Sequence, residues 1–277
     1  MKKIVTRKSS VKNTILLLLL CLSACGVRAS NNEARQRNLD QRNLDRPDSM
    51  PLNQVIVLGA IHGQHKESEL FGIAELEAIL RAVKPDFILA EIPPGDLPPA
   101  LSQYRSSGEI SEGRVSHFPE YVQAVIPLQA ELGYEIVECA GWSAEMAKTR
   151  RTLLSQWKES RPDETRLVDE AMARADEEIE SGHKADDPMW IHSPEYDAIV
   201  KRGMTPYDDL FGADLGAGGW AAINASHYSL IDEAIARHRQ GGGKRFLVIF
   251  GAWHKYWFLE KLKERDDINL RSLRDFL

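Results

Sequence analysis

Apolar runs that end at breaking residues alternate, along most of this chain, with segments of helical periodicity. Residues 54–58 form a short β-branched run before Gly59, which is typical of a strand buried on both faces of a parallel sheet. Residues 87–90 form a second run, and the apolar positions of residues 70–83 between them recur at helical spacing until Pro85. Strand, helix and strand in close succession predict a βαβ unit with parallel strands.

The remaining patterns place a long helical stretch before one more strong strand. A helix interrupted at Pro127 is expected over residues 121–132, and a third strand over residues 134–139. The sequence thus predicts an α/β fold with a mainly parallel central sheet, flanking helices and a helical insertion between the third and last major strands. The later elements are expected at residues 143–158, 163–181, 194–201, 220–239 and 255–264 for helices, and 245–250 and, weakly, 268–270 for strands.

The first 50 residues have a different pattern. Five Lys and Arg residues without any acidic residue precede an apolar run at residues 15–22, which is too short to span a bilayer but suits a secretion signal. The segment Leu22-Ser23-Ala24-Cys25 resembles the lipobox of bacterial lipoproteins, and the resemblance implies cleavage before Cys25 and diacylation of its sulfur. An ordinary signal peptide with an incidental cysteine is the alternative. Residues 31–50 are almost entirely polar, with too little apolar surface to offset the entropy of ordering.

We therefore expect a lipoprotein signal peptide over residues 1–24, a lipidated Cys25 with a flexible tether over residues 25–50, and one domain over residues 51–277. The lipid anchor would hold the protein at a membrane of the bacterial cell envelope. Gly26 after the cysteine is similar to the pattern of lipoproteins sorted to the outer membrane, facing the periplasm, if the source is Gram-negative.

Net charge argues against a nucleic-acid partner. Removal of the signal peptide leaves 30 Lys and Arg against 41 Asp and Glu, so the net charge of −6 becomes −11 in the mature chain. Such a chain offers no basic field to neutralise phosphates. Cys139 is then the only thiol apart from the lipidated one, and its place at the end of an apolar run predicts a core residue.

Two of the expected strands end in the same four-residue pattern. Gly59-Ala60-Ile61-His62 follows the first strand, Gly251-Ala252-Trp253-His254 follows the last, and Glu91 follows the second. Ligands collect beyond the carboxyl ends of parallel strands, and we expect the glycines to let the backbone turn so that the histidines project there. Two imidazoles and a carboxylate could hold a divalent metal with an open position for water or substrate. Taken singly, each histidine is better explained as a surface or core residue.

The same residues resemble the pattern of the TraB/Tiki family, which includes the GumN-like proteins and is distantly related to erythromycin esterases and haem-binding iron-regulated lipoproteins. That pattern has two Gly-x-x-His motifs near the ends of the domain and a Glu after the second strand. It is matched by Gly59, His62, Glu91, Gly251 and His254, and the likeness extends loosely over residues 55–262. The resemblance implies a metal-dependent hydrolase, with peptidases that use manganese or cobalt among the characterised members.

The resemblance is incomplete on the helix before the last strand. The family commonly carries an Arg-Asn pair there, whereas this chain has Ile223-Asn224. Asn224 can still offer a polar group to a substrate. The missing Arg leaves an anionic substrate or intermediate without that cation, unless Arg245 or Arg202 replaces it in space.

His65 and Trp253 are two further candidates. His65 follows His62 at a spacing that suits another metal ligand or an outer partner, although a polar loop histidine explains it equally well. Trp253 lies inside the second motif, in a crowd of aromatic residues that indicates either core packing or an aromatic wall for a substrate or planar cofactor. Its aromatic neighbours are Phe250, Tyr256, Trp257 and Phe258.

We therefore expect a lipid-anchored metal-dependent hydrolase that acts on a peptide, ester or amide bond. His62 and His254, helped by Glu91 or His65, would bind Mn, Co, Zn or Fe, and the metal would lower the pKa of a bound water that attacks an acyl carbon. Glu91 is either a ligand or the general base. The alternatives are a non-enzymatic haem- or metal-binding envelope lipoprotein that uses the same histidines, and an envelope interaction protein.

Overall fold

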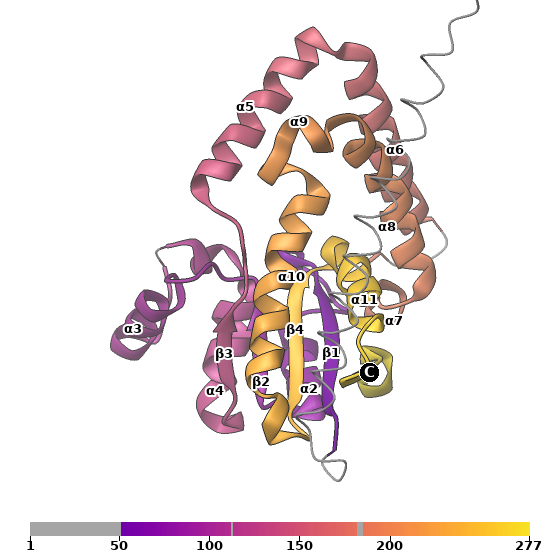
Figure 1. The fold of residues 1–277 in the computed structure, drawn as a ribbon. Coiled ribbons are helices and arrows are strands. Elements are labelled where there is room, and N and C mark those ends of the chain that lie inside the picture. Colours follow the sequence, from indigo (N-terminus) through magenta and orange to yellow (C-terminus); the bar gives the residue numbers. More distant parts are fainter. Residues whose placement is uncertain (1–50, 112, 182–184) are drawn as a thin grey trace, which may run out of the picture. The chain divides into compact units, whose positions relative to one another are not determined.

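Five parallel strands form one central sheet in the computed structural model, which describes residues 51–111, 113–181 and 185–277 (Figure 1). Their order is β3-β2-β4-β1-β5, so the last long strand lies between the first two. The expected α/β fold with its parallel sheet is confirmed, whereas the predictions for residues 1–24, Cys25 and the tether lie outside the described residues. The strands are β1 (Asn53–Ala60), β2 (Phe87–Ala90), β3 (Glu135–Glu138), β4 (Arg245–Gly251) and β5 (Ile268–Arg271).

Helices cover both faces of the sheet. On one face, side chains such as Leu58 and Ile249 pack against α2 (Ile73–Val83) and α4 (Ile126–Leu132). On the other, alternate residues of the same strands pack against α10 (Trp220–Arg237) and α11 (Lys255–Lys263). Because both faces are covered, β1 and β4 are continuous apolar runs, which is why the sequence pattern identifies them.

Cys139 belongs to the core on the α10 side, as expected. Its thiol is buried, and burial raises its pKa to about 12. A thiol with so high a pKa is almost wholly protonated at neutral pH and is therefore a poor nucleophile.

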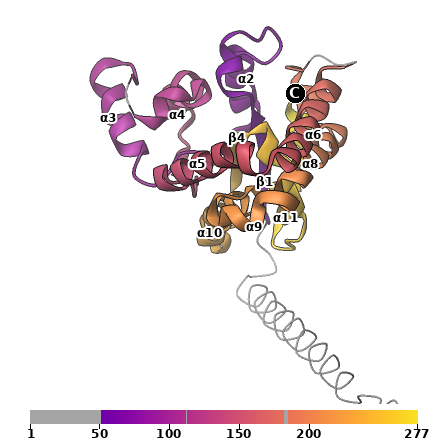
Figure 2. The same ribbon diagram turned by 90° about the horizontal axis from the view of Figure 1, so that it is seen from above.

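A helical insertion between β3 and β4 stands beyond the carboxyl ends of the strands. Figure 1 shows α5 and α6 rising above this end of the sheet, and Figure 2 looks down on it, with α5 crossing over β4. The buried stripe of α6 packs on α8, where Gly203 comes so close that a Cβ there would lie 2.7 Å from the Cβ of Ala175. The helices are α5 (Ala144–Ser160), α6 (Pro162–Glu180), α7 (Pro188–Ile191), α8 (Pro194–Tyr207) and α9 (Ala213–Leu215).

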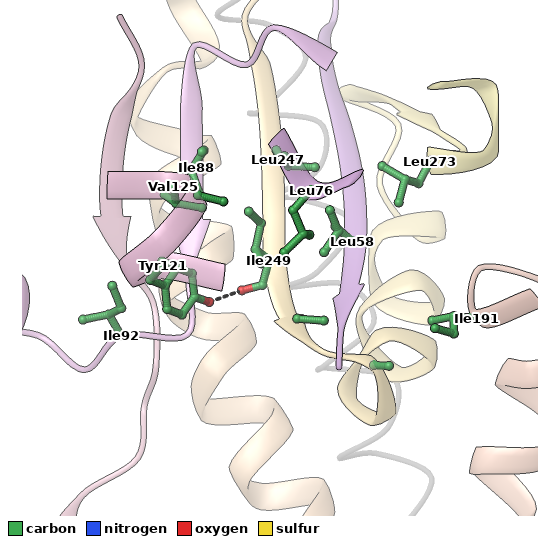
Figure 3. Close-up of a cluster of buried hydrophobic side chains, with 14 of the residues drawn as sticks. Leu58, Leu76, Ile88, Ile92, Tyr121, Val125, Ile191, Leu247, Ile249 and Leu273 are labelled. Atoms are coloured by element: carbon green, nitrogen blue, oxygen red, sulfur yellow. Dashed lines mark hydrogen bonds between the residues drawn. The ribbon is translucent and has the colours of Figure 1, made fainter. Parts of the chain in front are cut away.

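The helix expected around Pro127 begins as a π-helix over Glu120–Val125 and continues as α4. In a regular α-helix the ring of Pro127 would clash with the carbonyl of Gln123, and the wider π turn relieves that clash. This turn carries Tyr121, whose hydroxyl donates to the Ile249 carbonyl at 2.7 Å (Figure 3). The same hydroxyl accepts from the Glu91 amide at 2.7 Å. Tyr121 thereby ties the end of β2 to the end of β4.

The helix α3 (Leu97–Ser107) was not predicted from the sequence. Its two prolines lie in the first turn, where the missing amide hydrogens have no partner to lose. Within the described ranges, no helix is both long and apolar enough to cross a membrane. The short 3₁₀ and π segments are His62–Lys66, Arg114–His117, Asp208–Gly212, Gly216–Gly218, Arg239–Gly241, Ala252–His254 and Leu273–Phe276.

Candidate functional site

The two Gly-x-x-His motifs and Glu91 come together at the carboxyl ends of three adjacent strands. β4 pairs with β1 on one side and with β2 on the other, and Gly251 lies opposite Ala60. The Nε2 atom of His62 lies 3.9 Å from Oε2 of Glu91, and that same oxygen accepts a 2.8 Å hydrogen bond from the Gly251 amide. The expected meeting of His62 and Glu91 is therefore present in the structure.

The glycines of the two motifs do not provide the left-handed backbone turns that were expected of them. The left-handed residue is His62 itself, with a φ of 48°, and neither Gly59 nor Gly251 is among the residues of positive φ. The glycines instead permit close contact, because a Cβ on Gly251 would lie 2.6 Å from Nε2 of His62. A Cβ on Gly59 would lie 2.9 Å from the Cα of Ala252. The two motifs thus pack directly on one another, and this contact sets where the His62 ring lies.

Glu120 is a site residue that the sequence analysis missed. Its side chain is 1% exposed, and its Oε1 lies 2.7 Å from Nδ1 of His62. A carboxylate only accepts, so Nδ1 of His62 carries the hydrogen and donates it, and Nε2 is left facing Glu91. The second oxygen, Oε2 of Glu120, is buried without a hydrogen-bond partner. The π-helix that carries Glu120 is a kind of turn that recurs at functional sites, and Pro127 was its only trace in the sequence.

The pKa values of His62 and Glu91 are both raised. Burial is the largest influence on His62 and opposes its charge, but the hydrogen bond and charge of Glu120, together with the charge of Glu91, raise the pKa of this imidazole overall. Burial is also the largest influence on Glu91 and raises the pKa of its carboxyl against the effects of His62 and the Gly251 amide. A carboxyl whose pKa is raised toward that of a neighbouring imidazole can exchange a proton with it more readily.

His254 has a fixed tautomer and stays neutral. Its Nδ1 lies 2.7 Å from Oδ1 of Asn224, while Nδ2 of Asn224 donates to the Trp220 carbonyl at 2.9 Å. The amide oxygen therefore accepts from Nδ1, and Nε2 of His254 keeps its lone pair. Burial, reinforced by the charges of His227 and His62, holds the pKa of His254 well below its usual value. Asn224 is fully buried, so it positions His254 and does not offer the expected contact with a substrate.

His65 is held by the backbone. Its Nδ1 lies 2.6 Å from the Phe71 carbonyl, and its Nε2 accepts from the Ile61 amide at 3.0 Å. Burial lowers the pKa of this imidazole. Because both ring nitrogens are engaged, His65 shapes the loop after β1 and has no lone pair for the metal ligation that was expected of it.

The described donors do not complete the metal site that the family resemblance implies. His62 and Glu91 converge as a pair of donors, but no group of three or more His, Cys, Asp or Glu side chains within the described ranges is arranged to hold an ion. His254, the expected third ligand, has its ring stacked on Trp220 with 4.4 Å between centroids. His62, Glu91 and Glu120 are placed so that protons can pass among them.

Two clefts adjoin His62. One of 530 Å³ is lined by His62 and Trp253, and one of 830 Å³ is lined by Phe118, whose ring contacts that of His62 with 5.2 Å between centroids. Phe250 and Phe258 are fully buried in the core, as core packing predicts, whereas Trp253 is half-buried and lines the smaller cleft, so its role as an aromatic wall stays a prediction.

The arginines that lie near the site are Arg114 and Arg150, and not Arg245 or Arg202, which the sequence analysis considered. Arg245 contacts Gln54 and the Val83 carbonyl at the amino ends of the strands, and Arg202 pairs with Glu178. The positive charge of Arg114 instead acts on Glu91, and that of Arg150 acts on His254. Neither residue belongs to a sequence motif, so only their positions in space identify them.

Comparisons with known proteins find no match among protein-family models, curated proteins or solved structures. The geometry of the site is therefore the basis for a functional proposal, and the TraB/Tiki resemblance rests on the two Gly-x-x-His motifs and Glu91 alone.

Proposed function

We propose that this protein is a lipid-anchored envelope hydrolase of the TraB/Tiki type, which cleaves a peptide, ester or amide bond beside His62. The observation that carries the proposal is the chain of contacts from Glu120 through His62 to Glu91, with distances of 2.7 Å and 3.9 Å. A buried carboxylate behind an imidazole and a second carboxyl in front of it form an arrangement suited to general acid–base catalysis.

The proton transfers follow from these positions. Nε2 of His62 takes a proton from a water molecule as the water oxygen attacks the acyl carbon, and Glu120 stabilises the resulting imidazolium through Nδ1. Glu91 acts in its protonated form in this proposal, a form that the raised pKa of its buried carboxyl favours, and it gives its proton to the leaving nitrogen or oxygen as the acyl bond breaks. The imidazolium then returns its proton to Glu91, which restores both groups. One water is consumed, and an acid and an amine or alcohol are released.

The metal-dependent version of this proposal needs a change in the site. His62 and Glu91 would supply two ligands and Nε2 of His254 a third, although the described side chains as they stand are not arranged to hold an ion. A divalent ion bound there would supply a more acidic water. The alternative is a haem or metal carrier, in which Nε2 of His254, left with its lone pair by the contact of Nδ1 with Asn224, would bind the metal.

The experiment compares hydrolysis by the wild-type protein and by Glu91→Gln and His62→Asn variants, with Glu177→Gln, an exposed carboxyl outside the site, as the matched control. Substrates are a library of fluorogenic peptides and a set of aryl esters, each assayed with EDTA and with added Mn²⁺, Co²⁺ or Zn²⁺. We expect both site variants to lose about 100-fold or more in rate while their thermal unfolding stays cooperative. A folded Glu91→Gln variant with the wild-type rate would sink the proposal.

Two further readouts separate the versions of the function. Activity that disappears with EDTA and returns with one metal favours the metal-dependent version, and activity that is indifferent to EDTA favours the histidine and carboxyl groups alone. A Soret band on haemin titration that is lost in a His254→Ala variant, with no hydrolysis by the wild type, favours the carrier.

A further inference from the structure

The larger cleft beside His62 contains charged and aromatic side chains that the proposed hydrolysis does not use. It measures 830 Å³, and its walls come from the loop after β2, the 3₁₀ turn Arg114–His117 and the start of α5. Phe118 lies between the cleft and the reaction centre, because it lines the cleft and also contacts the ring of His62. A molecule whose scissile bond lies at His62 therefore has this cleft as a neighbouring subsite.

Arg114 lines this cleft, and none of the described carboxylates is its counterion. No carboxylate in the described part of the chain forms an ion pair with it, and its Nε is buried without a hydrogen-bond partner. Its guanidinium carbon lies 6.0 Å from the centroid of the Phe118 ring. Buried donors in folded proteins are nearly always paired, so an unpaired Nε indicates an acceptor that the described residues do not provide.

The two buried polar atoms without partners that the described ranges contain are Nε of Arg114 and Oε2 of Glu120. Both belong to the segment that joins the cleft to His62. The other buried side-chain donors and acceptors of the described residues have partners, so this coincidence marks the segment as the place where a ligand completes the hydrogen bonding.

A second arginine adds positive potential. The guanidinium carbon of Arg150 lies 6.0 Å from the Trp142 ring, which lines the cleft, and its Nε donates to the Tyr207 hydroxyl at 2.8 Å. The polar partner of Arg150 among the described residues is thus a neutral hydroxyl. The amino end of α5, which Ser143 caps, lies at the wall of the cleft that Trp142 lines and adds the positive end of a helix dipole. Asp96 is the one carboxylate among the lining residues, and it is half-exposed.

We propose that this cleft binds an anionic oxygen group of the substrate, a carboxylate or a phosphate, with Arg114 as its direct partner and Arg150 supplying further positive charge. A guanidinium matches the planar oxygens of such groups with two parallel hydrogen bonds, and Phe118 and Trp142 exclude water around them. The inference rests on the proposed function, since it names the substrate class of the same site. The substrate is an acyl compound that carries a negative charge away from the bond that is cleaved, on the far side of Phe118 from His62.

The test measures binding in a protein that does not turn over. In a Glu91→Gln background, isothermal titration calorimetry at low salt compares an N-acetylated dipeptide that has a free carboxylate, its carboxamide and inorganic phosphate. The variants are Arg114→Met, Arg114→Lys and Arg150→Met. The matched control is Arg151→Met, an exposed neighbour on the same helix. Thermal unfolding of each variant confirms that it is folded.

We expect the dipeptide carboxylate or phosphate to bind at least about tenfold more tightly than the carboxamide. Arg114→Met abolishes this preference, Arg114→Lys and Arg150→Met reduce it, and Arg151→Met retains it. The tighter of the two anions identifies the group as a carboxylate or a phosphate.

Equal affinity for the dipeptide and its amide, or an unchanged preference in folded Arg114→Met, overturns the proposal. So does the absence of anion binding up to about 10 mM, since a single guanidinium contact in a formed cleft is detectable in that range. The binding measurements do not depend on whether the protein hydrolyses a substrate. A wild-type protein that cleaves nothing but binds the anion through Arg114 contradicts the proposed function alone, and a hydrolase indifferent to Arg114 contradicts this inference alone.

Discussion

The two Gly-x-x-His motifs share a sequence pattern and lie on neighbouring strands, yet their histidines have opposite properties. His62 has a carboxylate partner, a side chain that is 37% exposed and a raised pKa. His254 has the neutral amide of Asn224 as its partner, lies stacked on Trp220 and has a strongly lowered pKa. The difference shows that the motif places an imidazole, while partners from distant helices decide whether it exchanges protons or stays neutral.

The largest expected effect comes from Gly251→Ala. The new Cβ would lie 2.6 Å from Nε2 of His62, so the ring must move away from Glu91. A misplacement of about 1 Å costs on the order of 100-fold in rate, and we expect that loss of hydrolysis with little change in thermal unfolding. Gly212→Ala is the control, because it lies outside the clefts beside His62 and a Cβ there would meet Oδ1 of Asp208 at an ordinary contact distance of 3.4 Å. A Gly251→Ala enzyme with full activity would show that the contact between the motifs does not position His62.

A smaller effect is expected from Glu120→Gln, which removes the charge behind His62. The amide keeps an oxygen for Nδ1, but the loss of negative charge lowers the pKa of His62. The acid limb of the rate profile then moves to lower pH, and the maximum rate falls about tenfold, as for other outer partners of a reacting histidine. Rate profiles and histidine titration by NMR measure both changes. An acid limb that does not move contradicts the role assigned to Glu120.

The converse change, Asn224→Asp, gives His254 the kind of partner that His62 has. A carboxylate at 2.7 Å from Nδ1 favours the imidazolium, so the pKa of His254 rises and the difference between the two histidines narrows. Titration of His254 by NMR measures the shift, and an unchanged pKa would mean that burial alone controls this imidazole. Asn224→Ser, which keeps a neutral partner, is the control.

The smallest effect is on the pH dependence of stability. A raised pKa means that His62 stabilises the fold below its unfolded value of 6.5, and this contribution is lost as the pH rises through the folded pKa. A lowered pKa means that His254 stabilises the fold above 6.5, and acidification removes this contribution. Denaturant midpoints of His62→Asn and His254→Asn from pH 5 to 8 should therefore diverge from the wild type in opposite directions. Parallel curves would contradict the assigned protonation states.

The extent to which the sequence predicts the fold depends on how local each signal is. β1, β2 and β4 are covered on both faces, so their burial appears directly as apolar runs. The helix α3 begins with prolines that a pattern of breaking residues does not distinguish from a loop. The π-helix before α4 depends on how Pro127 is accommodated, and the sequence shows only that a regular helix is interrupted.

The residues of the candidate site also fall into those that local sequence patterns identify and those that depend on distant contacts. His62, Glu91 and His254 follow strands that have clear local patterns, and this made them predictable before the structure was known. Glu120 contacts a histidine 58 residues away, and Asn224 one 30 residues away, and no periodicity connects such pairs. The contacts of His65 with the backbone likewise depend on the path of one loop.

The sequence by itself determined the α/β class, the two motifs and the order of strands along the chain, because burial and turn formation act on neighbouring residues. The tertiary structure alone decided that β4 lies between β1 and β2. Strand order in a parallel sheet depends on how all the crossing helices pack, and no local segment carries that information. This order sets the two motifs side by side and places Glu91 next to His62. The two histidines consequently have different partners, although their sequence motifs are the same.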